Sequence, residues 1–188
     1  MKLLTVRRRD DMELLRIKTD KDERFRAAME LYEESFPLHE RRTAESQSAA
    51  LADEDYHFNL IFDGDIFLGL LLCWETRGFV YVEHFCILPE LRGKNYGAKA
   101  LELLSRGGKG VILEIDPLVD DISVRRKNFY ERAGYRTNGF EHVHPPYRRG
   151  FNGHRLVIMS SPAPLSEEEY KIFARYLSET VMRDEPRG

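Results

Sequence analysis

The 188-residue sequence lacks several features that would by themselves indicate a class of protein. It contains only two cysteines, Cys73 and Cys86, so it has neither a disulfide framework nor the cysteine spacing of a metal site. Both lie in apolar stretches, which predicts buried, reduced thiols. We therefore expect no bound metal and no disulfide.

Long apolar runs and a strong charge of one sign are also missing. No segment reaches the length of a bilayer-spanning helix, and residues 1–20 lack the uninterrupted apolar stretch of a signal peptide. The net charge is −3, and the basic run Arg7–Arg9 is followed at once by Asp10 and Asp11. These absences predict a cytoplasmic protein that binds neither membrane nor nucleic acid.

Repeats, low-complexity tracts and Ser/Gly/Pro-rich linkers are absent as well. We therefore expect residues 1–188 to form a single domain. An apolar share of 42%, with eleven Phe and nine Tyr, supplies a substantial core and excludes wholesale disorder. The sequence does not define the oligomeric state, so a homodimer stays open.

Apolar residues recur with the period of strands in some segments and of helices in others. The strand-like segments are 12–18, 56–62, 66–76, 79–87, 111–115, 135–140 and 154–160. The helix-like segments are 20–36 behind an Asp20 N-cap, 44–52, 98–104, 124–132 and 166–181 behind Ser166. This order predicts an α/β (α+β) fold: a mixed, mainly antiparallel sheet of about six to seven strands with helices on both faces.

The junction from Ile87 to Leu104 is the most informative segment. A strand ends, a loop rich in glycine and basic residues follows, and a helix begins at once, so free backbone N–H groups and the helix dipole favour an anion. Gly93 and Gly97 leave room for a phosphate, and Arg92 and Lys94 can add charge-assisted bonds. The segment predicts a pyrophosphate cradle. The alternative is a basic turn that only connects two elements.

A second segment, Phe129-Tyr130-Glu131-Arg132-Ala133-Gly134-Tyr135, lies one strand further on. Together with the loop 92–98 and the strand 81–87, it resembles the GNAT superfamily of acyl-CoA-dependent N-acetyltransferases. The loop is similar to the family signature of Arg or Gln, two residues, Gly, one residue, then Gly or Ala. The second segment is similar to the family's Phe-Tyr helix ending in Gly and an aromatic residue. The resemblance is specific over residues 79–135 and implies a GNAT-like fold.

The resemblance also implies acetyl-CoA as the cofactor. The residues expected to bind it are Ile87, Leu88, Arg92, Gly93, Lys94, Asn95, Tyr96, Gly97, Ala98, Ser123, Phe129 and Tyr130. Two of these depart from the family pattern. Asn95 replaces the usual first cradle glycine, but Asn is the non-glycine residue that best tolerates the left-handed backbone conformation. Ser123 replaces an Asn of many members, which removes one expected polar contact to the cofactor.

Two residues are candidates for catalysis. The resemblance implies that Tyr130 points at the cofactor sulfur and protonates the departing thiolate; the alternative is a packed aromatic residue. Glu83 is a charged residue inside an apolar strand. Partial burial is expected to raise its pKa into a range that suits a general base, which would take a proton from the amine. It would act directly or through water, and the alternative is a solvated sheet face. His84 is expected on the opposite face.

The remaining expectations concern the oxyanion and the acceptor. The resemblance implies that the oxyanion meets a backbone N–H near Ile87 or Leu88. The segment 142–150 is predicted to be a loop in which His144 and Tyr147 bind the amine, or an ordinary polar hairpin loop. The expected activity is transfer of an acetyl group from acetyl-CoA to a primary amine of a small molecule. A protein α-amine or lysine as acceptor, and a catalytically idle acyl-CoA-binding module, stay open.

Overall fold

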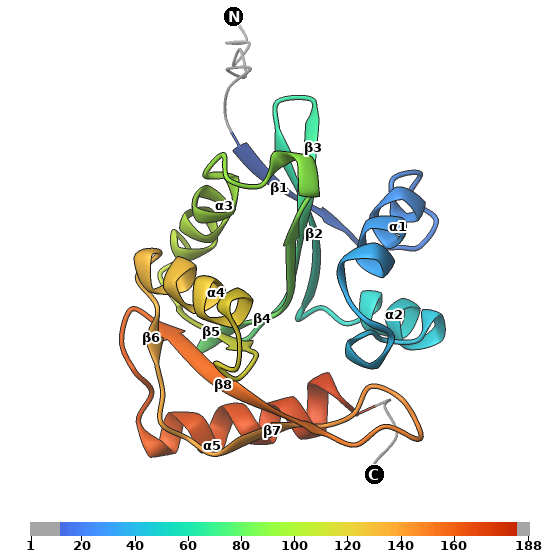
Figure 1. Cartoon of the computed structure of the whole chain (residues 1–188). Helices are drawn as coiled ribbons and strands as arrows, with labels where there is room; N and C mark the ends of the chain where they lie inside the picture. The colour runs from blue at the N-terminus through green and yellow to red at the C-terminus, as the bar shows by residue number, and fades with distance from the viewer. Residues whose placement is uncertain (1–11, 184–188) are drawn as a thin grey trace, which may run out of the picture.

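The computed structural model describes residues 12–183, so the basic run Arg7–Arg9 lies outside the described residues. One mixed sheet forms the centre of the molecule, in the order β1-β2-β3-β4-β5-β8-β6, with β7 also paired to β8 (Figure 1). Its strands are β1 (Met12–Ile17), β2 (Tyr56–Asp63), β3 (Ile66–Glu75), β4 (Phe79–Ile87), β5 (Gly110–Ile115), β6 (Arg136–Thr137), β7 (His142–His144) and β8 (His154–Ser161). The pairing of β4 with β5 is parallel, and the other strand pairs are antiparallel.

Helices cover both faces of the sheet, as the sequence predicts. The helices are α1 (Phe25–Ser35), α2 (Ala44–Leu51), α3 (Tyr96–Ser105), α4 (Asp121–Arg132) and α5 (Glu167–Tyr176). Residues of α1, α2 and α5 share one apolar core with the sheet, and residues of α3 and α4 share a second core on the other face. Figure 1 shows α3 and α4 on one side of the central strands and α1 and α2 on the other.

The sheet has eight strands rather than the predicted six to seven. The predicted strand 135–140 is confined to the two residues of β6, and β7 begins inside the segment 142–150 that was expected to be a loop. Both short strands pair with β8, because the chain leaves β8 after Asn138, whose N–H donates to Ile158 O at 2.9 Å, and returns to it at His142. Two short strands therefore replace one longer predicted strand.

Helix α1 begins later than its sequence indicates. Asp20 is not its N-cap, because the helix starts at Phe25 behind Arg24. The Asp22 carboxylate accepts hydrogen bonds from the Arg24 backbone N–H at 3.0 Å and from the Arg24 Nε at 2.8 Å, which holds the preceding residues in a turn. The predicted capping box of the last helix is confirmed, with Ser166 and Glu169 as reciprocal partners.

Two expectations about the whole chain concern thiols and membranes. Cys73 and Cys86 are both free and buried, as predicted. Across residues 12–183, no helix combines the length and the apolar character that crossing a bilayer requires.

Candidate functional site

A cavity of about 1010 Å³ lies where β4 and β5 part. The two strands pair from Phe79 opposite Gly110 to Val82 opposite Leu113, and beyond that point each continues without the other. The helix wall of this cavity comprises Arg92, Gly93, residues 95–98, Phe129 and Tyr130. The carboxylate wall comprises Glu40, Glu83, His84, Glu114, His144 and Tyr147.

The helix wall has the geometry of an anion site. Asn95, the residue before α3, has a φ of 64°, and Gly93 has a φ of 77°, so both adopt the left-handed region. The prediction that Asn95 takes the backbone shape of a glycine is therefore confirmed. Its side chain makes no capping bond, which leaves the first backbone N–H groups of α3 without a cap. Arg92 lies beside them, whereas Leu88 and Lys94 do not line the cavity.

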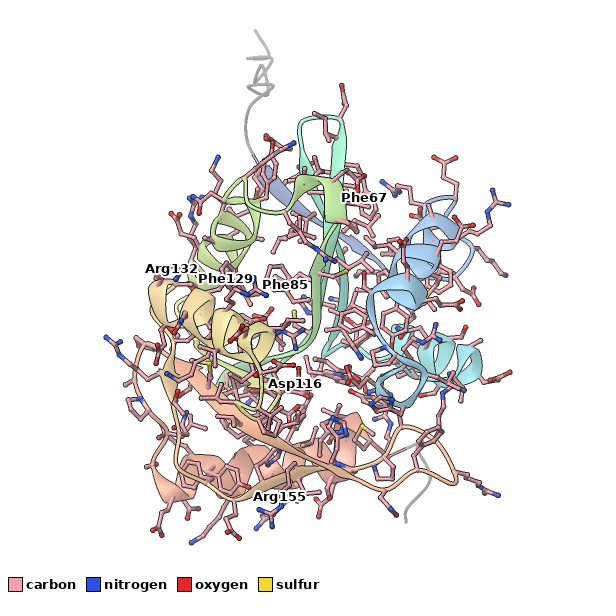
Figure 2. The ribbon with its side chains drawn as sticks, in the orientation of Figure 1. Phe67, Phe85, Asp116, Phe129, Arg132 and Arg155 are labelled. Atoms are coloured by element: carbon pink, nitrogen blue, oxygen red, sulfur yellow. The ribbon has the colours of Figure 1, made fainter. Side chains whose placement is uncertain are left out.

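Gly97 has a different neighbour from the phosphate that its sequence position indicates. A Cβ at this position would lie 3.1 Å from Phe129 Cζ and 3.5 Å from Phe85 Cζ. Figure 2 shows Phe85 and Phe129 in the space between β4 and the helices α3 and α4. The missing side chain therefore leaves room for the Phe129 ring of α4, while Gly97 also lines the cavity as predicted for a cradle residue. At Gly93, by contrast, an added Cβ would meet no atom within 4 Å.

A β-bulge in β4 reverses the alternation of its side chains. Leu72 lies opposite His84 and Cys73 lies opposite Val82, so Glu83 is an extra residue between the two pairs. Successive residues of a regular strand point to opposite faces, and one extra residue shifts that period by one. Glu83 and His84 therefore both serve the carboxylate wall, within 4.0 Å of each other. The expected opposite orientation of His84 is wrong.

Glu83 is a fully buried carboxylate with three partners. Its side chain is 0% exposed, and Arg42 Nη2 lies 2.9 Å from Oε1. Trp74 Nε1 donates to Oε2 at 2.7 Å, and the Tyr147 hydroxyl donates to Oε1 at 3.0 Å. Burial alone raises the pKa of Glu83, but the Arg42 charge and these hydrogen bonds outweigh it and lower the pKa from 4.5. The predicted rise in pKa is wrong, because no local pattern revealed the Arg42 partner.

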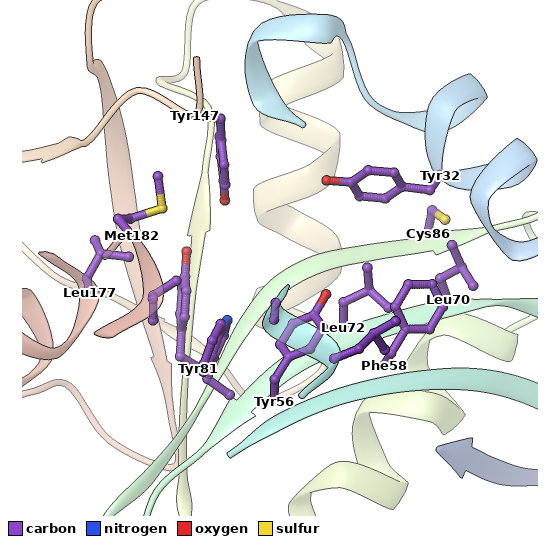
Figure 3. Packing of buried hydrophobic residues seen from close by; sticks show 14 of the residues in the cluster. Tyr32, Tyr56, Phe58, Leu70, Leu72, Tyr81, Cys86, Tyr147, Leu177 and Met182 are labelled. Carbon is purple, nitrogen blue, oxygen red and sulfur yellow. The ribbon is translucent and has the colours of Figure 1, made fainter. Parts of the chain in front are cut away.

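Tyrosine side chains converge on the region of Glu83. Figure 3 shows the hydroxyl groups of Tyr32, Tyr56, Tyr81 and Tyr147 pointing toward a shared space. Burial raises the pKa of all four phenols, and the Glu83 charge raises each further. All four therefore stay protonated and can act as hydrogen-bond donors at neutral pH.

Glu114 is a second buried carboxylate, which the sequence analysis missed. The Tyr81 hydroxyl donates to its Oε2 at 2.5 Å, and His142 Nε2 contacts its Oε1. Burial raises the pKa of Glu114, but the nearby His144 and the bond to His142 outweigh it and lower the pKa from 4.5. The available signal was the one used for Glu83, a carboxylate inside an apolar strand (VILEI).

The two residues predicted to bind the amine lie side by side. His144 is the last residue of β7, and its ring stacks on that of Tyr147 with centroids 4.8 Å apart. Both line the cavity next to Glu114, as part of the carboxylate wall. The structure thus brings these two residues to the same cavity as the cradle.

The backbone N–H groups at the end of β4 are not equivalent. The Leu88 N–H donates to Leu68 O at 2.9 Å, so it is already used within the sheet. Backbone N–H groups alternate in direction along a strand, so that of Ile87 points to the other edge, where β5 has parted. Of the two expected oxyanion donors, Ile87 remains a candidate and Leu88 does not.

Tyr130 lies at the base of the helix wall. It is 8% exposed and lines the cavity, and its hydroxyl makes no hydrogen bond to any residue in the described range 12–183. Burial raises the pKa of Tyr130 to about 12, so the phenol keeps its proton at neutral pH. Ser123 does not line the cavity, because its side chain forms a capping box with Asp120 at the start of α4.

The mixed sheet, its parting strands and the uncapped start of α3 between them match the fold class of acyl-CoA-dependent acyltransferases. Residues 25–135 match the family described as Acetyltransferase (GNAT) family, and the chain belongs to this family. A protein from Bacteroides thetaiotaomicron that is assigned to the same family has a solved structure with 31% identity and a TM-score of 0.84. The match covers 90% of this chain and 97% of that one.

Two further relatives extend the comparison. YjbC of Bacillus subtilis (strain 168), named as an acetyltransferase, is 25% identical over 107 residues; the match covers 55% of this chain and 53% of YjbC, about half its length. YncA of Salmonella typhimurium, solved with acetyl-CoA, has 16% identity and a TM-score of 0.54, covering 83% of this chain and 96% of that one. At 16% identity, the match to YncA supports a shared fold and nothing further.

Proposed function

We propose that the protein transfers the acetyl group of acetyl-CoA to a primary amine of a small molecule. The observation that carries this proposal is a single cavity with two unlike walls. The helix wall offers free N–H groups and Arg92 to the pyrophosphate of acetyl-CoA. The carboxylate wall offers acidic and imidazole groups to a basic acceptor. Family membership supports acetyl-CoA as the cosubstrate.

The chemistry assigned to the helix wall is the departure of the thiolate. Tyr130 is protonated, free of other hydrogen bonds in the described range, and faces the cavity, so it can protonate the leaving sulfur. The Ile87 N–H, directed to the gap between β4 and β5, would stabilise the oxyanion. Holding thioester and amine together contributes on the order of 7–11 kcal/mol, and a positioned acid adds about a hundred- to ten-thousand-fold.

The choice of a small molecule rests on the hydrogen bonds of Arg148, the residue after Tyr147 of the carboxylate wall. Arg148 donates from Nε to Leu38 O at 3.0 Å and from Nη2 to Arg42 O at 3.1 Å. These bonds tie the loop after β7 to the segment between α1 and α2. An extended peptide that entered between those two segments would have to break these bonds. The bridged site favours a compact amine over a protein α-amine or lysine.

The experiment combines binding with turnover. Acetyl-CoA at a hundred times its Kd should stabilise the protein by about 2.7 kcal/mol in thermal or urea unfolding. Thiol release should then be screened with polyamines, amino acids, aminoglycosides, arylalkylamines and short peptides. Turnover of small amines but not of peptides is expected. Binding without release from any acceptor would indicate an idle acyl-CoA-binding module, and preferential release with peptides would reverse the substrate class.

A further inference from the structure

His144 has one ring nitrogen in use and one free. Its Nδ1 lies 2.6 Å from Pro145 O, and because a carbonyl oxygen can only accept, Nδ1 must carry the proton. In the neutral ring, Nε2 therefore holds a lone pair. This atom is buried and has no hydrogen-bond partner within residues 12–183, although the side chain is only 2% exposed and lines the cavity. A buried acceptor without a donor indicates a position for a donor from a ligand.

A carboxylate oxygen stands beside that lone pair. Glu114 Oε2 lies 3.9 Å from His144 Nε2, which is too far for a direct hydrogen bond. Two acceptors at this separation can share one donor, because an ammonium nitrogen bonding to each at about 2.9 Å fits between them. Glu114 itself is fixed by Tyr81 and His142. After Nε2 takes a proton, the same carboxylate faces a positive charge.

The corresponding pair on β4 is less suited to this role. His84 Nδ1 is also buried without a partner in the described residues, and it lies 4.0 Å from Glu83 Oε1. Both carboxylate oxygens accept from a tyrosine, but Glu83 Oε1 also faces Arg42 Nη2 at 2.9 Å. Burial also lowers the pKa of His84, so a proton taken there is poorly held. The two histidines thus differ in the carboxylate that would support the charge.

We propose that His144 is the catalytic base that accepts a proton from the substrate ammonium group, with Glu114 positioned to stabilise the imidazolium. This assignment rests on the proposed acetyl transfer. The ammonium gives one proton to Nε2, and the neutral amine bonds to the thioester carbon. The C–S bond breaks, and sulfur leaves with the electron pair and takes the proton of Tyr130. The second proton leaves nitrogen as the amide forms and restores Tyr130, while His144 releases its proton to solvent.

Titratable groups from several elements face His144. Besides Glu114 on β5, the titratable groups facing it are His84 on β4, His154 on β8, Glu40 before α2 and Tyr147 in the following loop. A base of this kind gives the rate an acidic limb, because the protonated ring accepts nothing.

The test replaces His144 with asparagine. The Asn amide nitrogen can keep the bond to Pro145 O, while the Nε2 lone pair is lost. We expect His144→Asn to keep the Kd for acetyl-CoA within about twofold and to lose about a hundred- to ten-thousand-fold in kcat/KM, together with the acidic limb. His57→Asn is the matched control, because His57 Nδ1 also lies near a carboxylate, 3.6 Å from Glu75, but does not line the cavity.

A second readout separates a lost base from a damaged site. The small amine with the fastest thiol release is compared with its aminooxy analogue, which is already neutral at pH 7. The defect of His144→Asn should be much smaller with the analogue. Equal losses with both acceptors, or an unchanged pH profile, would overturn the assignment. His144→Gln carries the same test if the Asn variant does not fold. Failure of the unaltered protein to bind acetyl-CoA would instead overturn the proposed function itself.

Discussion

The two walls of the cavity are built in different ways. The helix wall depends on backbone shape, with Gly93 and Asn95 in the left-handed region and the uncapped start of α3 beside them. The carboxylate wall depends on side chains, because Glu83 and Glu114 are each buried among partners from other elements. A wall of the first kind needs a few correct residues in succession. A wall of the second kind needs the whole fold to be in place.

This difference predicts that mutations affect stability at one wall and ligand binding or turnover at the other. Removing the cationic partner of a buried carboxylate on the carboxylate wall leaves that charge uncompensated and so reduces the stability of the whole protein. A change on the helix wall alters a local loop or removes one functional group, so its effect falls mainly on binding or turnover. Three substitutions test this contrast.

Arg42→Met should have the largest effect. Arg42 is 2% exposed and also donates to Ser46 Oγ at 3.1 Å and to Val181 O at 2.7 Å. Its removal leaves Glu83 as an uncompensated buried charge, so the free energy of unfolding at pH 7 should fall by about 3–5 kcal/mol. Urea unfolding measures this loss. Arg26→Met is the control, because Arg26 is 92% exposed and should change stability by less than about 0.5 kcal/mol.

The pH dependence of the Arg42→Met deficit checks its cause. In the parent protein the pKa of Glu83 is lowered from 4.5, so the ion pair contributes fully above about pH 4.5 and is lost as the pH falls through the lower, folded-state pKa. In the variant the unpaired carboxylate is relieved when it takes a proton. The deficit should therefore shrink as the pH is lowered from 7 through 4.5. A deficit that stays constant over this range would show that Arg42 acts through packing alone.

Tyr130→Phe should have the next largest effect, and on turnover rather than stability. The change removes a hydroxyl with no hydrogen bond in the described residues and keeps the ring, so folding and acetyl-CoA affinity should persist. The kcat should fall about a hundredfold, the low end for one lost acid, because a thiolate is a good leaving group.

Steady-state thiol release measures the Tyr130→Phe loss, with Tyr135→Phe as its control. Tyr135 also has a buried hydroxyl without a partner in the described part of the chain, but it does not line the cavity. Equal rates for Tyr130→Phe and the parent protein would make solvent the acid.

Asn95→Val should have the smallest effect and should stay local to the helix wall. A β-branched residue at a φ of 64° costs about 1–2 kcal/mol, so the loop should distort and acetyl-CoA affinity should fall about tenfold. Asn95→Gly, which fits the same φ, should bind acetyl-CoA like the parent protein. Isothermal titration of both variants decides the question: identical affinities would show that this position places no demand on the backbone.

The sequence predicts the helix wall better than the carboxylate wall for the same physical reason. The left-handed Asn95 and the helix after it both depend on residues close in sequence. Arg42 and Glu83 are brought together from distant parts of the chain, and no periodicity reports such a pair.

Two other misses also have physical causes. The bulge at Glu83 is a property of the pairing between β3 and β4, so a period-2 reading of β4 alone placed His84 on the wrong face. Glu114 could have been predicted from the sequence, because it is a carboxylate inside an apolar strand, as Glu83 is. Its importance follows from His142 and His144, which only the pairing of β7 with β8 brings to it.

The bulge in β4 also governs where this chain can tolerate a change of length. Deleting one residue after Val82 would exchange the inward and outward sets, so that Phe85 and Cys86 would each have to enter the opposite core. The length of β4, nine residues between the turn before Phe79 and the loop after Ile87, is therefore fixed by the two cores. The strand itself can therefore vary in residue type but not in number.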